Sequence, residues 1–502
     1  MRKMFRAGLT AGFLLAPLAA CNSDRLTVPN YQNPTPGSIQ GDVAAAVPLL
    51  ATGILRNVRD NHAGWVSGVG ILGRESYNYT PTEGRNTTGY LVDPDVQTSF
   101  GGGALWSGFY TTRRNIFNLL NLAEGAADES FSAANKSAVR GFAHTIDALQ
   151  LHYVIAARHD IGAPVDIYED ATKLAPFVSR DSVYNYIIGE LNQAATELGT
   201  AGGTFPFALH TGFAGFTTPA TFRQFNRALA ARVNAYRASL GVAGCGAARS
   251  AACYQLVLTN LTEAGAFFNP TPTTVAALNT GVNNVYSSAA SDVANGISNQ
   301  ASTNVVAHFR TDSGVALQAG GARDARYGRK VITIASRGLG ATSTVPHRAT
   351  TFDYSNYLVR ESPIPIIRNE ELILLRAEAR WFTGNKQGAI DDINTIRTVS
   401  GGLAPQPTAT TITLVGTATT VRPPLTVAST DDQFLDELLY NRRESLLFEG
   451  HRWIDMRRFG RLSQLTLDLP THKVVPQLVV PQAECLQRQG QTSPELRGPG
   501  CQ

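Results

Sequence analysis

Two runs of apolar residues in the C-terminal third of the chain repeat at the spacing of one helical face. The first run is Leu372, Leu375, Ala379 and Phe382, and the second is Ala389, Ile393, Ile396 and Val399. Between the runs, Gly384 can adopt the left-handed conformation that ends a helix, and Asn385 can cap the next helix. This pattern predicts a helical hairpin. A hairpin of about 34 residues cannot bury two apolar faces alone, so other helices must stack against it.

After this hairpin, the segment at 442–459 alternates charged side chains with bulky apolar ones. Its spacing predicts a helix over 432–449, ended by the following glycine, and a short helix that begins at His451. At three-residue spacing, Asp455 would lie within reach of Arg452 and Arg458. We interpret the segment as a partly buried lattice of ion pairs. Such a lattice fixes a packing geometry more surely than it adds stability.

Together, these segments resemble the C-terminal signature of the SusD/RagB family of outer-membrane nutrient-binding lipoproteins. The matching residues are Arg368, Glu371, Leu374, Ala377, Glu378, Ala379, Gly384, Ala389, Ile393, Asn394, Ile396, Arg397, Arg443, Glu444, Glu449, Gly450, Arg452, Asp455, Met456 and Arg458. The ending departs from the family pattern of Ile-Pro-x-x-Glu before Asn-Pro, because this chain has Val-Pro-Gln-Ala-Glu at 480–484, followed by Cys485. The resemblance implies a mainly α fold of stacked, tetratricopeptide-like helical hairpins with long irregular loops and minor β-structure.

The first twenty residues have the features of a bacterial lipoprotein signal peptide. Three basic residues precede an apolar run that is too short to span a bilayer. The run ends in Leu-Ala-Ala before Cys21, where such a signal is cut and the cysteine is acylated with palmitate-type chains. Two or three chains anchor a protein stably, because each buried methylene contributes about 0.8 kcal/mol. We predict a signal peptide at 1–20 and a lipidated, Pro- and Asn-rich tether at 21–36.

The rest of the chain is long enough for one large or two ordinary domains. We predict a helical body at 37–502, divided into an N-terminal part (37–270), a variable loop region (271–360) and the signature part (361–502). Helices are expected at Val43–Val58, Ser107–Glu124, Ala133–Arg158, Asp181–Leu198, Thr221–Leu240 and Tyr254–Phe267. Irregular segments rich in Gly, Thr, Ser and Asn are expected at 64–106, 270–350 and 401–430. Such long insertions are usually binding loops or disordered segments.

The net charge indicates which partners the protein can bind, and the cysteines indicate the cellular compartment in which it folds. The formal net charge is +4, from 43 Lys and Arg against 39 Asp and Glu, and it falls to about +1 without the three basic signal residues. No basic excess remains to neutralise phosphates, so nucleic acid is not an expected partner. Cys245 with Cys253, and Cys485 with Cys501, would form two local disulfides in an oxidising compartment. Free thiols are the alternative.

Motifs for catalysis or cofactor binding are scarce. The sequence at 68–73 matches GxGxxG, but the residues after it are not expected to continue as a helix, so we reject a dinucleotide site. Three pairs of adjacent acids are better explained by charges near helix starts, or by a solvated face, than by a glycosidase pair. The histidines in and after the helix predicted at 133–158 lack the spacing of zinc ligands. We predict no enzyme activity, no catalytic residue, no metal and no cofactor.

Aromatic and polar side chains occur together in the first irregular segment. They are Trp65, Arg74, Tyr77, Asn78, Tyr79, Arg85, Asn86, Tyr90 and Trp106. Aromatic rings bind the apolar faces of sugars, and Arg and Asn satisfy hydroxyl or carbonyl groups, so these residues are a candidate capture surface. The family resemblance places further contacts in the middle loops, where Tyr286, Arg326 and Tyr327 lie. The alternative for each ring is a place in the core.

The resemblance implies a lipid-anchored binding protein of the cell outer membrane that faces the exterior. It would sit as a lid on a SusC-like, TonB-dependent transporter and hand it an oligosaccharide or peptide. A tethered capture protein raises the local ligand concentration at a pore without turnover. Two other hypotheses remain open. One is a secreted helical-toroid glycoside hydrolase or lyase with two carboxylates facing one cleft, and the other is a structural envelope lipoprotein without a ligand pocket.

Overall fold

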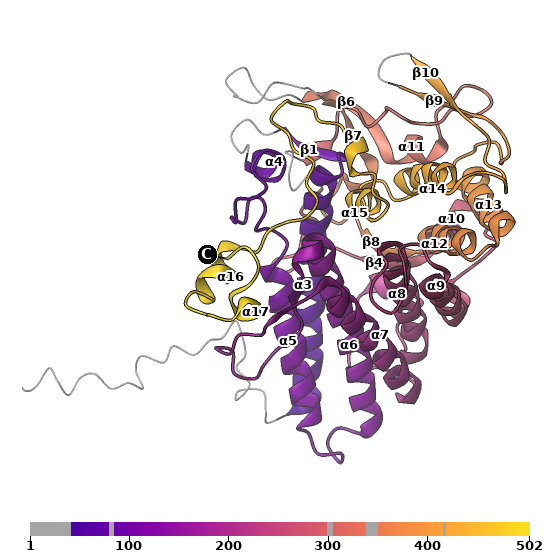
Figure 1. The fold of residues 1–502 in the computed structure, drawn as a ribbon. Coiled ribbons are helices and arrows are strands. Elements are labelled where there is room, and N and C mark those ends of the chain that lie inside the picture. Colours follow the sequence, from indigo (N-terminus) through magenta and orange to yellow (C-terminus); the bar gives the residue numbers. More distant parts are fainter. Residues whose placement is uncertain (1–41, 80–84, 299–304, 338–349, 415–417, 502) are drawn as a thin grey trace, which may run out of the picture.

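The computed structural model describes residues 42–79, 85–298, 305–337, 350–414 and 418–501, and helices dominate them (Figure 1). The first helices are α3 (Val43–Leu72), α4 (Arg85–Leu91), α5 (Ser107–Glu124), α6 (Ala133–Arg158), α7 (Arg180–Thr200), α8 (Pro219–Leu240) and α9 (Ala251–Glu263). The later ones are α10 (Val275–Asn279), α11 (Ala325–Lys330), α12 (Asn369–Phe382), α13 (Lys386–Thr395), α14 (Asp431–Ser445), α15 (Arg452–Arg458), α16 (Gln482–Gln487) and α17 (Pro494–Arg497). Single helical turns are η3 (His159–Ile161), η4 (Thr211–Phe213), η5 (Gly265–Phe267), η6 (Ser355–Tyr357), η7 (Ile396–Ser400) and η8 (Leu462–Gln464).

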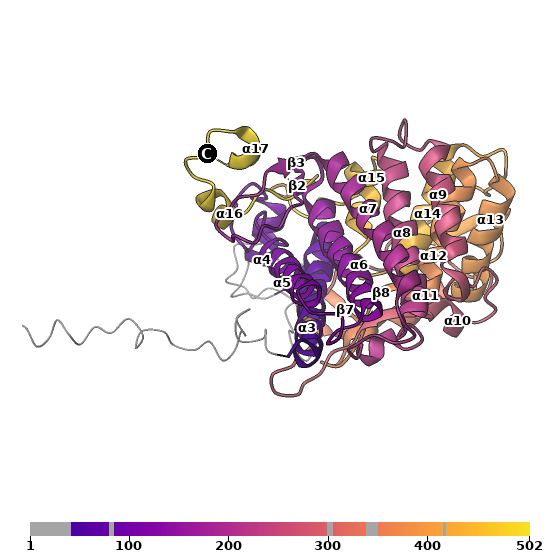
Figure 2. The same ribbon diagram turned by 90° about the horizontal axis from the view of Figure 1, so that it is seen from below.

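The long helices pack side by side, mostly in chain order. α5 packs on α6, α6 on α7, α7 on α8, and α8 on α9, while α12 contacts both α9 and α13. Figure 2 shows this row from α5 on one side to α13 on the other. Each helical pair covers an apolar face of the next pair, which confirms the predicted mainly α fold of stacked hairpins. The bounds of α5 and α6 agree with the prediction, and α7 and α8 begin one or two residues earlier.

The predicted hairpin is formed by α12 and α13. Gly384 has a φ of 91°, a conformation that residues with a side chain rarely adopt. Asn385 Oδ1 accepts a hydrogen bond from the Gly388 amide at 3.0 Å and so caps α13. The apolar faces of this hairpin pack on α14, where the rings of Trp381 and Phe434 stack with centroids 4.3 Å apart. The two helices and the break between them are therefore as predicted.

The first helix is longer than predicted. α3 continues through residues 64–72, which we expected to be irregular, and that stretch is largely buried. Its glycines lie where other side chains approach closely. A Cβ atom on Gly70 would lie 2.5 Å from the Phe448 ring, and one on Gly68 would lie 2.9 Å from the Tyr90 hydroxyl. Close packing of α3 therefore explains the glycine-rich motif without a bound phosphate.

Short antiparallel strand pairs occupy parts of the expected irregular segments. The strands are β1 (Ser76–Asn78), β2 (Ala163–Pro164), β3 (Phe177–Val178), β4 (Gly281–Asn284), β5 (Val305–Ala307), β6 (Val331–Arg337), β7 (Thr350–Tyr354), β8 (Ile364–Arg368), β9 (Thr410–Thr413) and β10 (Thr419–Arg422). β1 pairs with β5, β2 with β3, β4 with β8, β6 with β7, and β9 with β10. In Figure 1, β1, β6, β7, β9 and β10 lie together at one end of the helical body. Of these strands, β1 follows α3 directly and contacts it near the end that approaches the candidate site.

The helix predicted over 432–449 ends earlier because its last carbonyl group is used elsewhere. α14 ends at Ser445, whose carbonyl oxygen accepts hydrogen bonds from the side chains of Arg368 and Lys330. These bonds satisfy a carbonyl group that would otherwise be orphaned at a helix end. Phe448 follows with a φ of 55°. The turn brings α15 into contact with α3.

Buried ion pairs connect α12, α14 and α15, in agreement with the predicted lattice. Arg458 donates to both carboxylate oxygens of Glu378, and its Nε donates to Asp455 at 2.9 Å. Arg442 Nε donates to the other oxygen of Asp455 at 2.8 Å. The predicted contact between Arg452 and Asp455 was wrong. Arg442, which comes from α14, occupies that place, and the side chain of Arg452 lines a pocket instead.

A second buried pair joins the N-terminal row of helices to the C-terminal hairpin. Arg232 on α8 donates from Nε to Glu371 Oε1 at 2.7 Å and from Nη2 to Oε2 at 2.6 Å. The two side chains are 2% and 1% exposed. Glu371 lies in the first turn of α12, as expected for an acid near a helix start. It does not lie on a solvated face, because α8 covers it.

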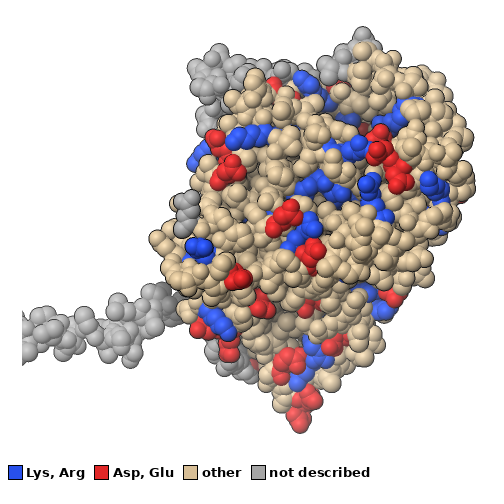
Figure 3. Space-filling model, viewed as in Figure 1, with Lys and Arg blue, Asp and Glu red and all other residues tan. Residues whose placement is uncertain are grey.

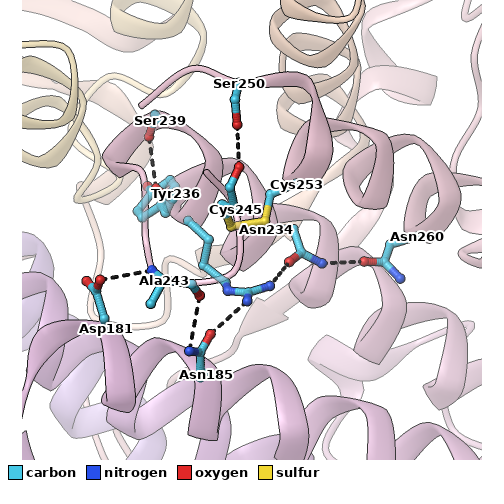
Figure 4. Close-up of a disulfide and its surroundings, with 11 residues drawn as sticks. Asp181, Asn185, Asn234, Tyr236, Ser239, Ala243, Cys245, Ser250, Cys253 and Asn260 are labelled. Atoms are coloured by element: carbon cyan, nitrogen blue, oxygen red, sulfur yellow. Dashed lines mark hydrogen bonds between the residues drawn. A yellow bond between two sulfur atoms is a disulfide. The ribbon is translucent and has the colours of Figure 1, made fainter. Parts of the chain in front are cut away.

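Two disulfides close local loops. They are Cys245–Cys253 and Cys485–Cys501, the two pairs expected from the sequence. Figure 4 shows the first one, which joins the loop after α8 to the start of α9, with its hydrogen-bonded surroundings. In that loop the Ala243 amide donates to Asp181 at 2.9 Å, and the Ala243 carbonyl accepts from Asn185 at 3.2 Å. The loop is thus attached to α7 as well.

One hydrophobic core extends from Val47 to Cys501 and includes residues of all three predicted parts of the body. The division of the body at 270 and 360 remains a prediction. Among the described residues, no helix combines the length and the apolar character needed to cross a bilayer. The predicted signal peptide, the lipidated Cys21 and the tether at 21–36 lie outside the described residues.

Candidate functional site

A small polar pocket lies where the C-terminal end of α3 meets α14 and α15. Its volume is about 120 Å³, and ten of its twelve lining residues are polar. They are Arg74, Glu75, His308, Arg310, Thr311, Ser313, Arg443, Leu447, Arg452, Gln464, Leu465 and Thr466. We call it the arginine pocket. Figure 3 shows Lys and Arg side chains on this face of the molecule, over α14 and α15, with acidic side chains beside them.

Arg74 forms one wall and also caps α3. It follows the helix with a φ of 59°, and its Nη1 donates to the carbonyl oxygens of Ile71 at 3.3 Å and Leu72 at 3.1 Å. Its Nε and Nη2 donate to the carbonyl oxygens of Thr466 and Lys473. Burial lowers the pKa of Arg74. Its hydrogen bonds fix the guanidinium, so it supplies a stationary positive charge next to the pocket.

His308 and Arg310 form the wall contributed by the segment after β5. His308 Nε2 donates to Asp468 Oδ2 at 2.8 Å, and its Nδ1 accepts from the Arg310 amide at 3.2 Å. Burial lowers the pKa of His308, so the ring is neutral at neutral pH. Burial alone would raise the pKa of Asp468, but the hydrogen bond from His308 holds it below its ordinary value. Arg310 Nε lies 3.8 Å from Asp468 Oδ1.

Arg443 and Arg452 form the opposite wall and differ in their partners. Arg443 Nη2 donates to the Thr311 carbonyl oxygen at 2.8 Å, which ties α14 to the segment after β5. Arg452 makes no hydrogen bond or ion pair with any residue that the structure describes, and its side chain is only partly buried. Burial, together with repulsion by Arg443, lowers the pKa of Arg452 to about 10. Arg452 is therefore charged at neutral pH, with donors to spare.

Glu75 is a buried acid among these arginines. It is 2% exposed, and its Oε1 accepts from the Phe448 amide at 3.2 Å. Its Oε2 is buried and has no hydrogen-bond partner in the part of the chain that the structure describes. Burial raises the pKa of Glu75 to about 7, although neighbouring arginines partly oppose this shift. The group is thus close to half protonated at neutral pH and can then donate a hydrogen bond.

The arrangement is suited to binding an anionic group. Guanidinium groups form short, charge-assisted hydrogen bonds to planar oxyanions, often two at a time. Sites that enclose a whole small ligand usually have volumes of about 300–1,000 Å³. A pocket of about 120 Å³ therefore takes one terminal group of a longer ligand. Among the described residues, no three His, Cys, Asp or Glu side chains come together to hold a metal ion.

A larger cavity, of about 660 Å³, lies beside α16 and the second disulfide. One of its polar side chains is paired within the lining: Gln97 Nε2 donates to Cys485 Sγ at 3.3 Å and to the Gly500 carbonyl oxygen at 3.4 Å. Its lining contains no arginine or lysine. We favour the arginine pocket as the candidate site because it contains charged groups whose hydrogen-bonding capacity is unused.

The structure buries most of the ligand-binding residues proposed from the sequence. Eight of these side chains are between 2% and 7% exposed: Trp65, Tyr77, Asn78, Tyr79, Tyr90, Trp106, Tyr286 and Tyr327. Five of the eight lie on helices or strands, namely Trp65 on α3, Tyr77 and Asn78 on β1, Tyr90 on α4 and Tyr327 on α11. These eight residues do not line an open capture surface in this structure. Their placement agrees with the core alternative.

The arginines proposed from the sequence have different environments. Arg74 lines the arginine pocket, and it alone of the proposed residues does so. Arg326 is buried and donates to both carboxylate oxygens of Asp324. Arg85 lies over the Phe100 ring, 4.0 Å from its centroid. The side chain of Asn86 lies outside the described residues.

Sequence reasoning missed Glu75, Arg310 and Arg443 as site residues and assigned Arg452 to the ion-pair lattice. The sequence around Arg452 could have indicated its role. Arg452 is the first residue of a short helix that follows a glycine turn, so its side chain lies at the edge of the predicted ion-pair lattice. Glu75 carried no comparable signal, since its burial depends on contacts with the turn before α15.

Comparisons with known proteins agree with the fold. Residues 311–492 match the SusD family. A SusD superfamily protein from Parabacteroides distasonis is 15% identical with a TM-score of 0.61, over 88% of this chain and 96% of that one. NanU of B. fragilis is 12% identical with a TM-score of 0.60, over 90% and 96%. A laminarin binding SusD-like protein is 14% identical with a TM-score of 0.55, over 85% and 94%. No curated protein sequence matches significantly.

Proposed function

Since the chain belongs to the SusD/RagB family, we propose that it captures a nutrient at the cell surface and delivers it to a SusC-like, TonB-dependent outer-membrane transporter. The nutrient is an oligosaccharide or a peptide, and the protein binds it without turnover. A tethered receptor raises the local concentration of ligand at the transporter, so binding alone is useful. The residues that match the family, 311–492, include two of the four arginines of the pocket, Arg443 and Arg452.

The arginine pocket is the observation that carries this proposal. A structural envelope protein has no need of an arginine that lacks a partner, since an unused charged group that is partly buried costs stability. A hydrolase or lyase would need two carboxylates placed across a cleft. The lining of the pocket instead contains a single carboxyl group, that of Glu75, among arginines, and burial raises its pKa to about 7. Its chemistry supports holding a ligand.

Attachment to the membrane is proposed through Cys21. Acylation there would place the body at the outer membrane, facing the exterior, with residues 21–36 as a tether. A Pro-rich tether is extended and semi-rigid, so it would let the body tilt over a transporter while staying attached. The proposal needs no transmembrane helix, because two or three acyl chains are sufficient.

Co-purification tests the proposed function. The full-length protein with a C-terminal affinity tag is purified from detergent-solubilised envelopes of its own cells, beside the Cys21→Ala variant. We expect a β-barrel transporter with a plug domain to co-purify with the wild-type protein, and we expect the variant to leave the membrane fraction. The proposal is refuted if no transporter co-purifies, or if the variant remains anchored and partnered.

A further inference from the structure

Contacts with the described residues do not explain the position of the Arg452 side chain. It lines the arginine pocket and has no hydrogen-bond acceptor among the described residues, whereas Arg74 and Arg443 beside it are held by carbonyl groups. Placing like charges together without an acceptor is unfavourable. A bound anion would supply the missing acceptors. This arginine therefore indicates a ligand with a negatively charged group.

Glu75 provides a second, independent observation. Its Oε2 is buried at the pocket, and no residue that the structure describes donates or accepts a hydrogen bond there. Buried polar atoms in native proteins are nearly always paired, so an unpaired one calls for a partner from outside the chain. A protonated Glu75 would donate this hydrogen bond to an oxyanion. Arg452 and Glu75 could then hold the same anionic group from two sides.

We propose that the arginine pocket binds the carboxylate of an acidic sugar unit within an oligosaccharide. This inference rests on the proposed function and specifies its ligand class. The planar fork of a guanidinium matches a carboxylate, and Arg452 is the main donor. Arg310 and Arg74 add positive charge, so the potential in the pocket attracts the acidic unit.

The lining of the pocket favours a sugar over an acidic peptide. Next to the arginines lie the hydroxyl groups of Thr311, Ser313 and Thr466 and the amide of Gln464. These groups can exchange hydrogen bonds with ring hydroxyls. An Asp or Glu side chain brings an apolar stem, for which the pocket offers two leucines among its twelve residues. A uronic acid presents hydroxyls and carboxylate together.

Calorimetric titration tests the inference with the full-length protein in detergent. The probes are oligogalacturonate and alginate oligosaccharides, and the matched controls are the same oligosaccharides with their carboxyl groups reduced to alcohols. We expect at least one acidic probe to bind and its reduced form to bind about 10-fold or more weakly. Arg452→Ala should weaken binding of the acidic probe about 10- to 100-fold. Arg452→Lys should lose less, because it keeps the charge.

Arg56→Ala is the matched control variant. Arg56 is exposed on α3 and is not part of the pocket, so its removal should leave the affinity unchanged. The melting temperature of each variant is measured first, and Arg452→Lys serves if Arg452→Ala does not fold. The inference is overturned by equal binding of acidic and reduced probes, by an Arg452 variant that binds normally, or by failure of all acidic probes. Tighter binding of polyglutamate or of a sulfated oligosaccharide also overturns it.

The two proposals fail separately. If the transporter co-purifies while no acidic probe binds, the proposed function stands and the ligand class is wrong. If neither a transporter nor any oligosaccharide or peptide is bound, the proposed function itself is wrong, and the inference falls with it.

Discussion

The pair formed by Arg232 and Glu371 gives a sharp test of how this fold is held together. We consider Glu371→Gln, which preserves the shape of the side chain and removes its charge. Burial alone would lower the pKa of Arg232, but Glu371 holds it above its ordinary range. The variant would therefore leave a charged guanidinium in a site that is 2% exposed. The Ile366 carbonyl oxygen, at 2.5 Å, would remain as a neutral partner.

The size of the effect follows from this burial. Removing one partner of a buried pair usually costs about 3–5 kcal/mol, because the other charge is left uncompensated. At roughly 2.1 cal/mol/K per residue, the unfolding entropy of a body of this size is on the order of 1 kcal/mol/K. The melting temperature should therefore fall by about 3–5 °C. Differential scanning calorimetry at one scan rate, at pH 7, measures it.

A double variant separates the effect of an unpaired charge from loss of packing. In Arg232→Met/Glu371→Leu both charges are replaced by apolar groups, and such exchanges are often neutral or stabilising. We expect its melting temperature to lie above that of Glu371→Gln. The reasoning is refuted if Glu371→Gln melts within 1 °C of the wild-type protein, or if the double variant is no more stable than the single one.

Three further predictions test local features of the fold. Burial raises the pKa of Glu75 from 4.5 to about 7. The folded state therefore binds more protons, and stability should fall as the pH rises from about 4.5 to 7. Glu75→Gln should remove this slope, and urea midpoints that differ by a constant amount between pH 5 and 8 would contradict it. Replacing Cys245 and Cys253 by Ser opens a loop with a separation of 8 residues and should cost about 2–3 kcal/mol in urea unfolding; an unchanged midpoint would count against the disulfide. Gly70→Ala places a methyl group 2.5 Å from an aromatic ring and should cost about 1–3 kcal/mol. Gly189→Ala has nothing within 4 Å and should gain about 0.5–1 kcal/mol, so equal effects of the two would refute the packing argument.

Local signals in the sequence predicted the helices well. The apolar period and the caps depend on neighbouring residues, and they located α5, α6 and the hairpin of α12 and α13. Two ends were wrong for tertiary reasons. α3 continues because Phe448, far along the chain, packs against Gly70. α14 stops because Arg368 and Lys330 take the carbonyl group of Ser445.

The candidate site was less predictable because distant segments build it. Arg74 was proposed for its place among aromatic residues, and it lies in the pocket because it caps α3. Arg310 and Arg452 come from segments that local periodicity cannot bring together. The aromatic residues were proposed as a capture surface because glycines and tyrosines in the sequence suggested an open loop, but the structure buries these side chains.

α3 has 30 residues, which corresponds to a rod about 45 Å long. The described chain enters the fold at one end of this rod, and the arginine pocket lies at the other. If residues before Val43 are attached to a membrane, this helix holds the pocket away from the lipid surface. A ligand bound there would then reach a pore only when the whole body tilts toward the membrane. Ligand capture and ligand release would therefore take place in two different orientations of the same rigid body.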